Sequence, residues 1–378
     1  MSRHTFVYDP TTAAFQTDMH AIYRDLRDQH PVYVNSQGTF VLSRFADVWN
    51  AVHDWEAYSS DHVAEAAQQL PSMIYMDPPR HTGLRALVSR AFTPKRVADL
   101  EPRIRTVARS LLEGTGAPFD IAQQYAAPLP SIIMAELIGV PEEHRESFRG
   151  WTEAFIEVTS SADIASRVEN IYALFATLLD ERRTAPAADL MSALLAAEVD
   201  GTRLTDDELV GFCFLLLIAG NDTTTTLIGN GAELLVRHPD QRAELVADPT
   251  LIPAAVEEMV RIESPTQALP RTAMRDLELH DTVIPAGSRV MLLWGAANLD
   301  DREFPDADRF DIHRTIKRHL GFGHGLHFCI GASLARLEAR VAFEELLARM
   351  PDYELTEEPV RFVSNWARAW RSLPVVTR

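Results

Sequence analysis

The sequence predicts a mainly α-helical fold with a smaller β region. Helical spacing of apolar residues dominates from about Ser43 onward. Two shorter intervals, residues 31–44 and the stretch after Pro265, have the composition of β-strands instead. The third observation is a stretch without proline, residues 205–237, which is long enough to form one helix across the whole molecule.

The first β interval contains two apolar runs around a Ser-Gln-Gly turn and predicts two short strands. The helical patterns that follow are interrupted by prolines, because proline lacks a backbone donor and clashes with the preceding helical turn. These interruptions stand at Pro78, Pro79, Pro141, Pro186, Pro239 and Pro253. We therefore expect a series of separate helices before the second β interval.

The longest predicted helix is the central one. Thr205 is expected to begin it with a capping box, since Glu208 follows three residues later. Without an interrupting proline up to Arg237, it would be about 48 Å long at roughly 1.5 Å per residue. Residues 212–218 are apolar on nearly every face, which is typical of a buried helix.

A polar cluster follows in the middle of this helix. Ala219 and Gly220 are followed by Asn221, Asp222 and four threonines. Glycine and β-branched residues are poor helix formers, and a buried carboxylate is unfavourable. Local rules broken in mid-helix often mark a functional site. The alternative is a kinked helix whose threonines only bond to the backbone.

Residues 322–331 read Phe-Gly-His-Gly-Leu-His-Phe-Cys-Ile-Gly and form the most informative stretch of the chain. We expect Gly323, Gly325 and Gly331 to let the backbone curl tightly around Cys329. A helix is predicted directly after this loop, ending before Pro351. A helix N-terminus lowers the pKa of a nearby thiol, so we expect a thiolate suited to bind a metal.

A cysteine can also be a small buried hydrophobic residue, and this is our interpretation of Cys213, which lies in an apolar helical run. Cys329 differs because glycine and histidine surround it. Neither a CxxC pair nor a zinc-type cluster accompanies it. One sulfur supplies one bond, so the other ligands of a metal must come from a macrocycle.

Composition and charge exclude some functions. The chain has 378 residues, 46% hydrophobic and 24% charged, which is ordinary for a soluble protein. A net charge of −18 argues against a nucleic-acid partner. The N-terminus lacks the apolar region of a secretion signal or anchor, and the longest apolar run, residues 210–220, is shorter than the roughly 20 residues of a membrane span. With only two cysteines, far apart, we expect a cytoplasmic protein.

The cysteine loop resembles the heme-ligand loop of the cytochrome P-450 superfamily, whose pattern FxxGxxxCxG is matched at Phe322, Gly325, Cys329 and Gly331. Four further segments resemble family motifs in the family's order, as does the closing strand. They are residues 76–85, 219–224, 258–261, 304–310 and the tail 372–375. The resemblance implies the cytochrome P-450 fold, as a single domain over residues 1–378, with a long central helix over heme b. It also implies that Cys329 is the axial ligand of the heme iron.

The resemblance assigns further roles. Asp222 and Thr223 match the acid–alcohol pair that delivers protons during oxygen activation. Other residues match positions that contact the heme or its propionates; these are His81, Arg85, Ala219, Gly220, Arg271, Phe322, Gly323, His327 and Gly331. Glu258, Arg261 and Arg309 match a buried ion-pair network with a structural role.

The substrate pocket is less specific. By resemblance it is formed from residues 60–73 and 142–182, from the central helix and from the chain near the second β interval and the tail. The residues expected to line it are Phe212, Leu216, Ala219, Gln267, Leu269 and Trp366. They are mainly apolar, which implies a lipophilic small organic substrate.

The resemblance implies a monomeric bacterial monooxygenase that uses O2. Because the chain has no room for a flavin or nicotinamide domain, electrons are expected to come from separate proteins, and we expect a ferredoxin with an NAD(P)H-dependent reductase, although the sequence does not specify which. The only lysines are Lys95 and Lys317, near the arginines Arg90, Arg96, Arg314 and Arg318. In the family both segments lie where the electron donor docks, although scattered solvated charge is the alternative. A heme-thiolate enzyme of another reaction type, such as coupling, dehydration or peroxide-driven oxidation, is the second hypothesis. A non-catalytic heme sensor is the third.

Overall fold

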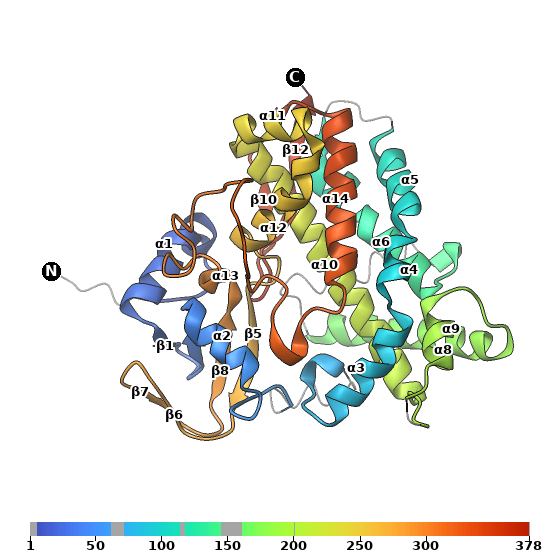
Figure 1. Ribbon diagram of the computed structural model, residues 1–378, viewed down its shortest axis with the longest axis horizontal. Coiled ribbons are helices and arrows are strands. Elements are labelled where there is room, and N and C mark those ends of the chain that lie inside the picture. Colours follow the sequence, from blue (N-terminus) through green and yellow to red (C-terminus); the bar gives the residue numbers. More distant parts are fainter. Residues whose placement is uncertain (1–5, 62–71, 114–117, 145–160, 200, 378) are drawn as a thin grey trace.

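Helix α10, Asp206–Arg237, runs through the middle of the molecule, and other helices pack around it (Figure 1). The computed structural model describes residues 6–61, 72–113, 118–144, 161–199 and 201–377. Thr205 is the N-cap, and the predicted capping box with Glu208 is present. By length and composition α10 could span a membrane, but 72% of its most apolar window is buried inside the protein. The predicted central helix is therefore confirmed as a core helix.

Helices α6 (Pro128–Ile138), α8 (Ser161–Thr184), α12 (Ile252–Ile262) and α14 (Ala332–Arg349) pack directly against α10. The remaining helices are α1 Ala13–Gln29, α2 Phe45–His53, α3 Arg80–Ala91, α4 Pro94–Ala98, α5 Glu101–Leu112, α9 Leu190–Ala196, α11 Pro239–Ala247 and α13 Trp294–Ala297. The predicted proline boundaries are confirmed: Pro79 precedes α3, while Pro239 and Pro253 stand in the first turns of α11 and α12.

The β region includes one large sheet, which lies to one side of the helices (Figure 1). This sheet has the strand order β1-β2-β8-β5-β3. These strands are β1 Val32–Val34, β2 Phe40–Leu42, β3 Tyr58–Ser59, β5 Ala268–Ala273 and β8 Arg289–Leu293. β1 and β2 pair antiparallel with Val32 opposite Leu42, while β2 and β8 are parallel. Both predicted β intervals are confirmed.

Smaller sheets complete the fold. β12 (Pro374–Thr377) lies between β4 (Phe119–Asp120) and β9 (Tyr353–Leu355), so the expected closing strand is present. β10 (Val360–Arg361) pairs with β11 (Trp370–Ser372), and β6 (Leu277–Leu279) pairs with β7 (Thr282–Ile284).

A buried ion pair joins α12 to the chain that follows the large sheet. The side chains of Glu258 and Arg261 are both 0% exposed. Nε and Nη2 of Arg261 donate to the two oxygens of Glu258, each at 2.7 Å. Nη1 of Arg261 donates to the carbonyl oxygens of Asn298 and Ala307, also at 2.7 Å. Four of its hydrogen bonds are thus made inside the protein, two to a carboxylate and two to carbonyls.

The third member of this network is Arg314, and the prediction of Arg309 was wrong. Nε of Arg314 donates to Glu258 at 3.1 Å, and its side chain is 12% exposed. Arg309 is 66% exposed and approaches only Asp311, at 3.7 Å. The backbone at Pro305, Asp306 and Arg309 curls around the Arg314 guanidinium, which donates to all three carbonyls. The carbonyl of Arg309, and not its side chain, therefore faces the network.

A second buried carboxylate has no such partner. Glu338 of α14 is fully buried, and neither of its oxygens has a hydrogen-bond partner among the described residues. Burial without a compensating charge raises the pKa of Glu338 to about 8. The folded protein therefore binds a proton at pH 7 that the unfolded chain releases.

Replacing Arg314 with alanine should destabilise the fold by about 2 to 4 kcal/mol, because it removes charge-assisted hydrogen bonds and exposes part of the Glu258 charge. Arg309→Ala is the matched control and should change stability by less than about 0.5 kcal/mol. Chemical denaturation of both variants measures the difference. An equal loss of stability in both variants would show that Arg309 also belongs to the network.

Glu338 should make stability fall as pH rises. Its folded-state pKa lies above the unfolded value, so between about pH 4.5 and 8 the unfolded chain binds fewer protons, at up to roughly 1.4 kcal/mol per pH unit. Glu338→Gln should flatten the dependence of the unfolding free energy on pH in this range. Parallel curves for the two proteins would show that Glu338 is already ionised in the fold.

Candidate active site

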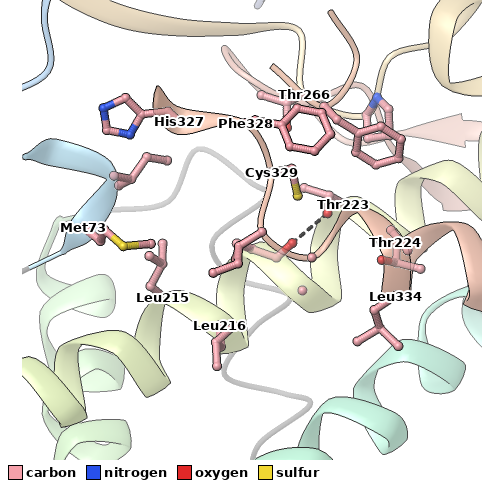
Figure 2. A pocket seen from close by; sticks show the side chains of 18 of the residues that line it. Met73, Leu215, Leu216, Thr223, Thr224, Thr266, His327, Phe328, Cys329 and Leu334 are labelled. Carbon is pink, nitrogen blue, oxygen red and sulfur yellow. Dashed lines mark hydrogen bonds between the residues drawn. The ribbon is translucent and has the colours of Figure 1, made fainter. Parts of the chain in front are cut away.

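A large cavity lies between α10 and the cysteine loop (Figure 2). Its empty volume, including the open mouth, is about 1230 Å³. One face of α10 lines it, because the contributing residues recur every three or four positions. They are Phe212, Leu215, Leu216, Ala219, Gly220, Thr223, Thr224 and Leu227. Cys329 lines the same cavity from the opposite side.

Two of the three loop glycines are required by the backbone. Gly323 and Gly325 have φ of 63° and 66°, in the region that side chains disfavour. A Cβ on Gly325 would also overlap the carbonyl oxygen of Val52. The expectation for Gly331 was wrong, since its φ is −86° and a Cβ there would meet only the Cys329 sulfur, at 3.9 Å.

The loop is fixed to the protein around the cysteine. The amide of Cys329 donates to the carbonyl of Phe322 at 2.9 Å. Arg85 of α3 donates from Nη2 to the carbonyl of Phe328 at 2.7 Å. The Arg336 guanidinium of α14 lies over the Phe322 ring, 4.3 Å from its centroid. Residues from both neighbouring helices thus hold the sulfur in place.

The expected lowering of the Cys329 pKa is overturned. Burial raises the pKa of this thiol above its ordinary value, and the backbone N–H groups of Gly331 and Ala332 only oppose this effect. The helix N-terminus is present, with α14 beginning at Ala332, but desolvation is the larger contribution. A bound metal cation would replace the proton, since a coordinating thiol is deprotonated.

Basic side chains gather at one end of the cavity. His81 and Arg85 lie on α3, Arg271 on β5 and His327 in the cysteine loop. The rings of His81 and His327 are 4.3 Å apart, and Nε2 of His327 is 3.1 Å from the Ser60 hydroxyl. The structure therefore brings all four predicted residues to this region, from segments far apart in sequence.

This basic cluster lacks an equal number of acidic partners. Both ring nitrogens of His81 are buried without a hydrogen-bond partner in the described part of the chain. Burial lowers the pKa of Arg271 to about 10, with Asp77 as the main opposing charge. Burial, followed by the charge of Arg271, lowers the pKa of His327 to about 3. Such a cluster fits a ligand with carboxylate groups, as the propionates of heme would supply.

The residues of the polar cluster on α10 have different surroundings: some line the cavity, and others are buried in the protein. Thr223 lines the cavity, and its hydroxyl donates to the carbonyl of Ala219 at 2.7 Å. Asp222 is 2% exposed, and its Oδ1 accepts a hydrogen bond from Nδ2 of Asn221 at 3.2 Å. The carboxyl group is thus next to the cavity along the helix, but only the threonine faces it.

The predicted substrate residues are placed in two groups. Phe212, Leu216 and Leu269 line the cavity. Gln267 does not, because its side chain accepts a hydrogen bond from Tyr23 and donates one to the Ser264 carbonyl. Trp366 packs near Ala367 and Ala369 instead. These two predictions were wrong, and the expected pocket segments at residues 62–71 and 145–160 lie outside the described residues.

Several lining residues were missed. Leu215, Thr224 and Leu227 continue the helical face that Phe212, Leu216 and Ala219 define, so helical spacing could have found them. Met73, in the predicted segment 60–73, does line the cavity. Lining residues from other elements had no comparable signal; they are Ile74, Phe92, Met134, Thr266, Trp294 and Leu334.

The described residues contain no cluster of three or more His, Cys, Asp or Glu side chains that could hold a metal. Cys213 is buried in the core, as predicted, and its pKa is raised to about 12 by burial. Cys329 therefore offers a single sulfur to the cavity. This donor set fits a metal whose other ligands belong to a macrocycle.

Comparisons with known proteins agree with this arrangement. A family model for cytochrome P450 matches residues 137–351. Cytochrome P450 130 of Mycobacterium tuberculosis is 42% identical, covering 90% of each chain. Vitamin D(3) 25-hydroxylase of Pseudonocardia autotrophica is 40% identical, covering 97% of this chain and 96% of its own. The solved structure of cytochrome P450 CYP109Q5 from Chondromyces apiculatus is 42% identical, with a TM-score of 0.93 over 98% of both chains.

Arg271→Met should have opposite effects on the cofactor-free and the cofactor-loaded protein. Without an anionic ligand, removing this buried charge should stabilise the fold by about 1 to 3 kcal/mol. With heme present, loss of a charge-assisted bond of about 2 kcal/mol should speed heme release more than tenfold. Thermal unfolding and heme transfer to a scavenger protein measure the two effects.

The matched control is Arg275→Met, whose arginine is 65% exposed and should change neither measurement. A loss of stability in the cofactor-free Arg271→Met protein would contradict the interpretation of Arg271 as an unpaired buried charge.

Proposed function

The chain belongs to the cytochrome P450 family, and we propose that it inserts one oxygen atom from O2 into a lipophilic small organic molecule. The protein is a heme monooxygenase of this family. For a hydroxylation, the substrate RH, O2, two electrons and two protons give ROH and water. The observation that carries this proposal is that Cys329 and Thr223 line one cavity from opposite sides.

Heme b is the proposed cofactor, and Cys329 is the proposed ligand of its iron. Bound heme supplies the site where O2 is bound and reduced. His81, Arg85, Arg271 and His327 would hold its carboxylates, as the surplus of buried basic groups suggests. Ala219 and Gly220 of α10 and Phe322 and Gly331 of the loop line the cavity and would contact the macrocycle, whereas Gly323, which the sequence also predicted, is not among the lining residues.

Thr223 and Asp222 are proposed to deliver the protons that the reaction consumes. The Thr223 hydroxyl faces the cavity and can exchange its bond to the Ala219 carbonyl for one to a ligand. The Asp222 carboxyl adjoins it on α10 but is directed away from the cavity. A proton could thus pass from Asp222 to Thr223 and then to the reacting oxygen.

A lipophilic substrate fits the remaining lining. Outside the basic cluster the lining side chains are mostly apolar, among them Met73, Leu215 and Leu269; the exceptions are Thr223, Thr224, Thr266 and Cys329. Burial of apolar surface would therefore supply most of the binding free energy. The relative named as a vitamin D(3) 25-hydroxylase supports this class of substrate without identifying the molecule.

Electrons are proposed to come from a ferredoxin with an NAD(P)H-dependent reductase, and the protein to act as a cytoplasmic monomer. Free cysteines at positions 213 and 329 suit a reducing compartment. Lys317 and Arg318 are exposed near the cysteine loop. The expected contribution of Arg314 to a docking surface is withdrawn, because this side chain is buried against Glu258.

The reduced, carbon-monoxide-bound protein should have the red-shifted Soret band of a thiolate-ligated heme, and Cys329→Ser should lose it. Absorption spectra of both proteins measure this. Cys213→Ser is the control and should keep the band, since Cys213 is buried away from the cavity. A wild-type protein without the shifted band would refute the proposed ligand and the reaction.

Thr223→Ala should uncouple electron consumption from product formation, because the hydroxyl that faces the cavity is lost. We expect at least a fivefold fall in product per electron, with hydrogen peroxide released instead. The control is Thr225→Val, which changes a buried threonine outside the cavity lining. Full coupling in Thr223→Ala would contradict the proton-delivery role.

A further inference from the structure

Two histidines meet beside the cysteine loop, outside the cavity. His324 belongs to the loop, and His53 is the last residue of α2. Nδ1 of His324 and Nε2 of His53 are 2.8 Å apart. Nδ1 of His53 is 2.6 Å from the carbonyl oxygen of Trp49, which can only accept, so this nitrogen carries a hydrogen. One further hydrogen must therefore lie between the two rings.

This geometry lets the pair bind one proton as a unit. In the neutral pair, His324 donates to His53. When a proton is added, His53 can donate from both nitrogens, to Trp49 and to His324. The end of α2 favours this positive charge, because unpaired carbonyls gather at a helix C-terminus.

A second proton is unfavourable. It would put hydrogens on both facing nitrogens, only 2.8 Å apart. Burial lowers the pKa of His324, and the charges of His53 and Arg318 lower it further. The geometry therefore allows the pair to bind one added proton as a unit and disfavours a second.

The charged residues around the two histidines already form ion pairs, so protonation of the histidine pair is the main change in local charge. Arg318 donates to both oxygens of Glu303, at 2.7 and 2.9 Å. Arg275 pairs with Asp54, next to His53, at 3.4 Å. Each of these pairs is close to neutral. The proton of the histidine pair therefore adds a charge beside two carboxylates, Glu303 and Asp54, that already have arginine partners.

The histidines belong to a ring-rich surface at the base of the cysteine loop. The Trp49 ring lies 4.8 Å from His53 and 4.2 Å from His324, and the Arg318 guanidinium lies over it at 4.5 Å. Phe328, which precedes Cys329, is 37% exposed, and its ring is 6.1 Å from His324. We define Trp49, His53, Arg318, His324 and Phe328 as the histidine patch.

We propose that the histidine patch contacts the electron donor and that the proton shared by His53 and His324 strengthens this contact as pH falls. This inference rests on the proposed function, in which an acidic iron–sulfur protein supplies electrons. The chain itself carries a net charge of −18, so an acidic donor is repelled overall and needs local positive charge to dock. The patch gains that charge next to the loop that carries Cys329.

The expected size of the effect follows from one added charge. At the dielectric constant of water, which suits this exposed patch, and a separation of about 4 Å, one charge pair contributes about 1 kcal/mol, or roughly fivefold in affinity. Salt should remove most of this gain, since the patch is exposed.

The test measures reduction of the heme-loaded protein by a plant-type [2Fe–2S] ferredoxin, at limiting ferredoxin and low salt. The rate for wild type should rise about fivefold from pH 8 to pH 6, relative to reduction by dithionite. His53→Gln and His324→Gln should rise less than twofold. His30→Gln is the control, since that ring stacks on Phe6 away from the patch and should leave the wild-type dependence unchanged.

An independent measurement needs no donor. Proton NMR should detect one far-downfield N–H resonance, from the hydrogen between the two rings, in wild type and not in either variant. Its absence from wild type, or an unchanged pH dependence of reduction in both variants, would overturn the inference.

A further variant distinguishes an error in the proposed docking surface from an error in the role of the shared proton. Replacing Lys317 and Arg318 with glutamate should slow reduction by ferredoxin more than tenfold at low salt, with dithionite reduction unchanged. If it does not, the donor docks elsewhere and the proposed partner surface is wrong, whatever the histidines do. If it does, and the pH dependence of the histidine variants is still that of wild type, only the role of the shared proton is refuted.

Discussion

The buried pair of Glu258 and Arg261 is the interaction on which the position of the cysteine loop depends. Arg261 donates to the carbonyl of Asn298, and the side chain of Asn298 in turn accepts from the amide of Leu320 at 2.7 Å. Leu320 stands two residues before Phe322, where the loop begins. A charge pair in α12 is thus linked through one asparagine to the backbone that presents Cys329. Because both charges are fully buried, loss of Glu258 would leave Arg261 without its carboxylate, and loss of Arg261 would leave Glu258 with Arg314 alone, so the loop is fixed by the same constraint.

Two kinds of buried charged group are present in this molecule: some have a partner of opposite charge and stabilise the fold, and others lack one and lie near the cavity. Glu258 is satisfied by Arg261 and Arg314, and Glu263 by Arg368, so these groups belong to the scaffold. Arg271 is buried with too few acidic neighbours, and His81, which lines the cavity, has no hydrogen-bond partner among the described residues. An uncompensated cationic cluster would be unfavourable unless an anionic ligand completes it. The imbalance of charge therefore locates the cofactor site independently of the sequence motif around Cys329.

Sequence alone predicted the features that depend on local chemistry. The capping box at Thr205, the prolines at helix starts and the glycines with positive φ at positions 323 and 325 each act within a few residues of their own position. The errors concern features that depend on the path of the chain. Arg314 replaced Arg309 because the backbone between them turns around one guanidinium, and spacing cannot reveal that. The Cys329 thiol has a raised pKa because burial, which no local pattern reports, outweighs the helix N-terminus.

The same distinction explains why the reaction is easier to infer than the substrate. The reaction depends on a few polar groups, Cys329, Thr223 and the basic cluster, whose hydrogen bonds are directional and therefore demand particular residues. The substrate contacts come from Met73, Leu215, Thr266 and Leu269, on four separate elements, and most are apolar. Apolar burial is not directional and depends mainly on area, so many side chains satisfy it equally well. The cavity wall therefore specifies lipophilicity and size, while Thr266, which lines the cavity outside the basic cluster, can orient a substrate by hydrogen bonding.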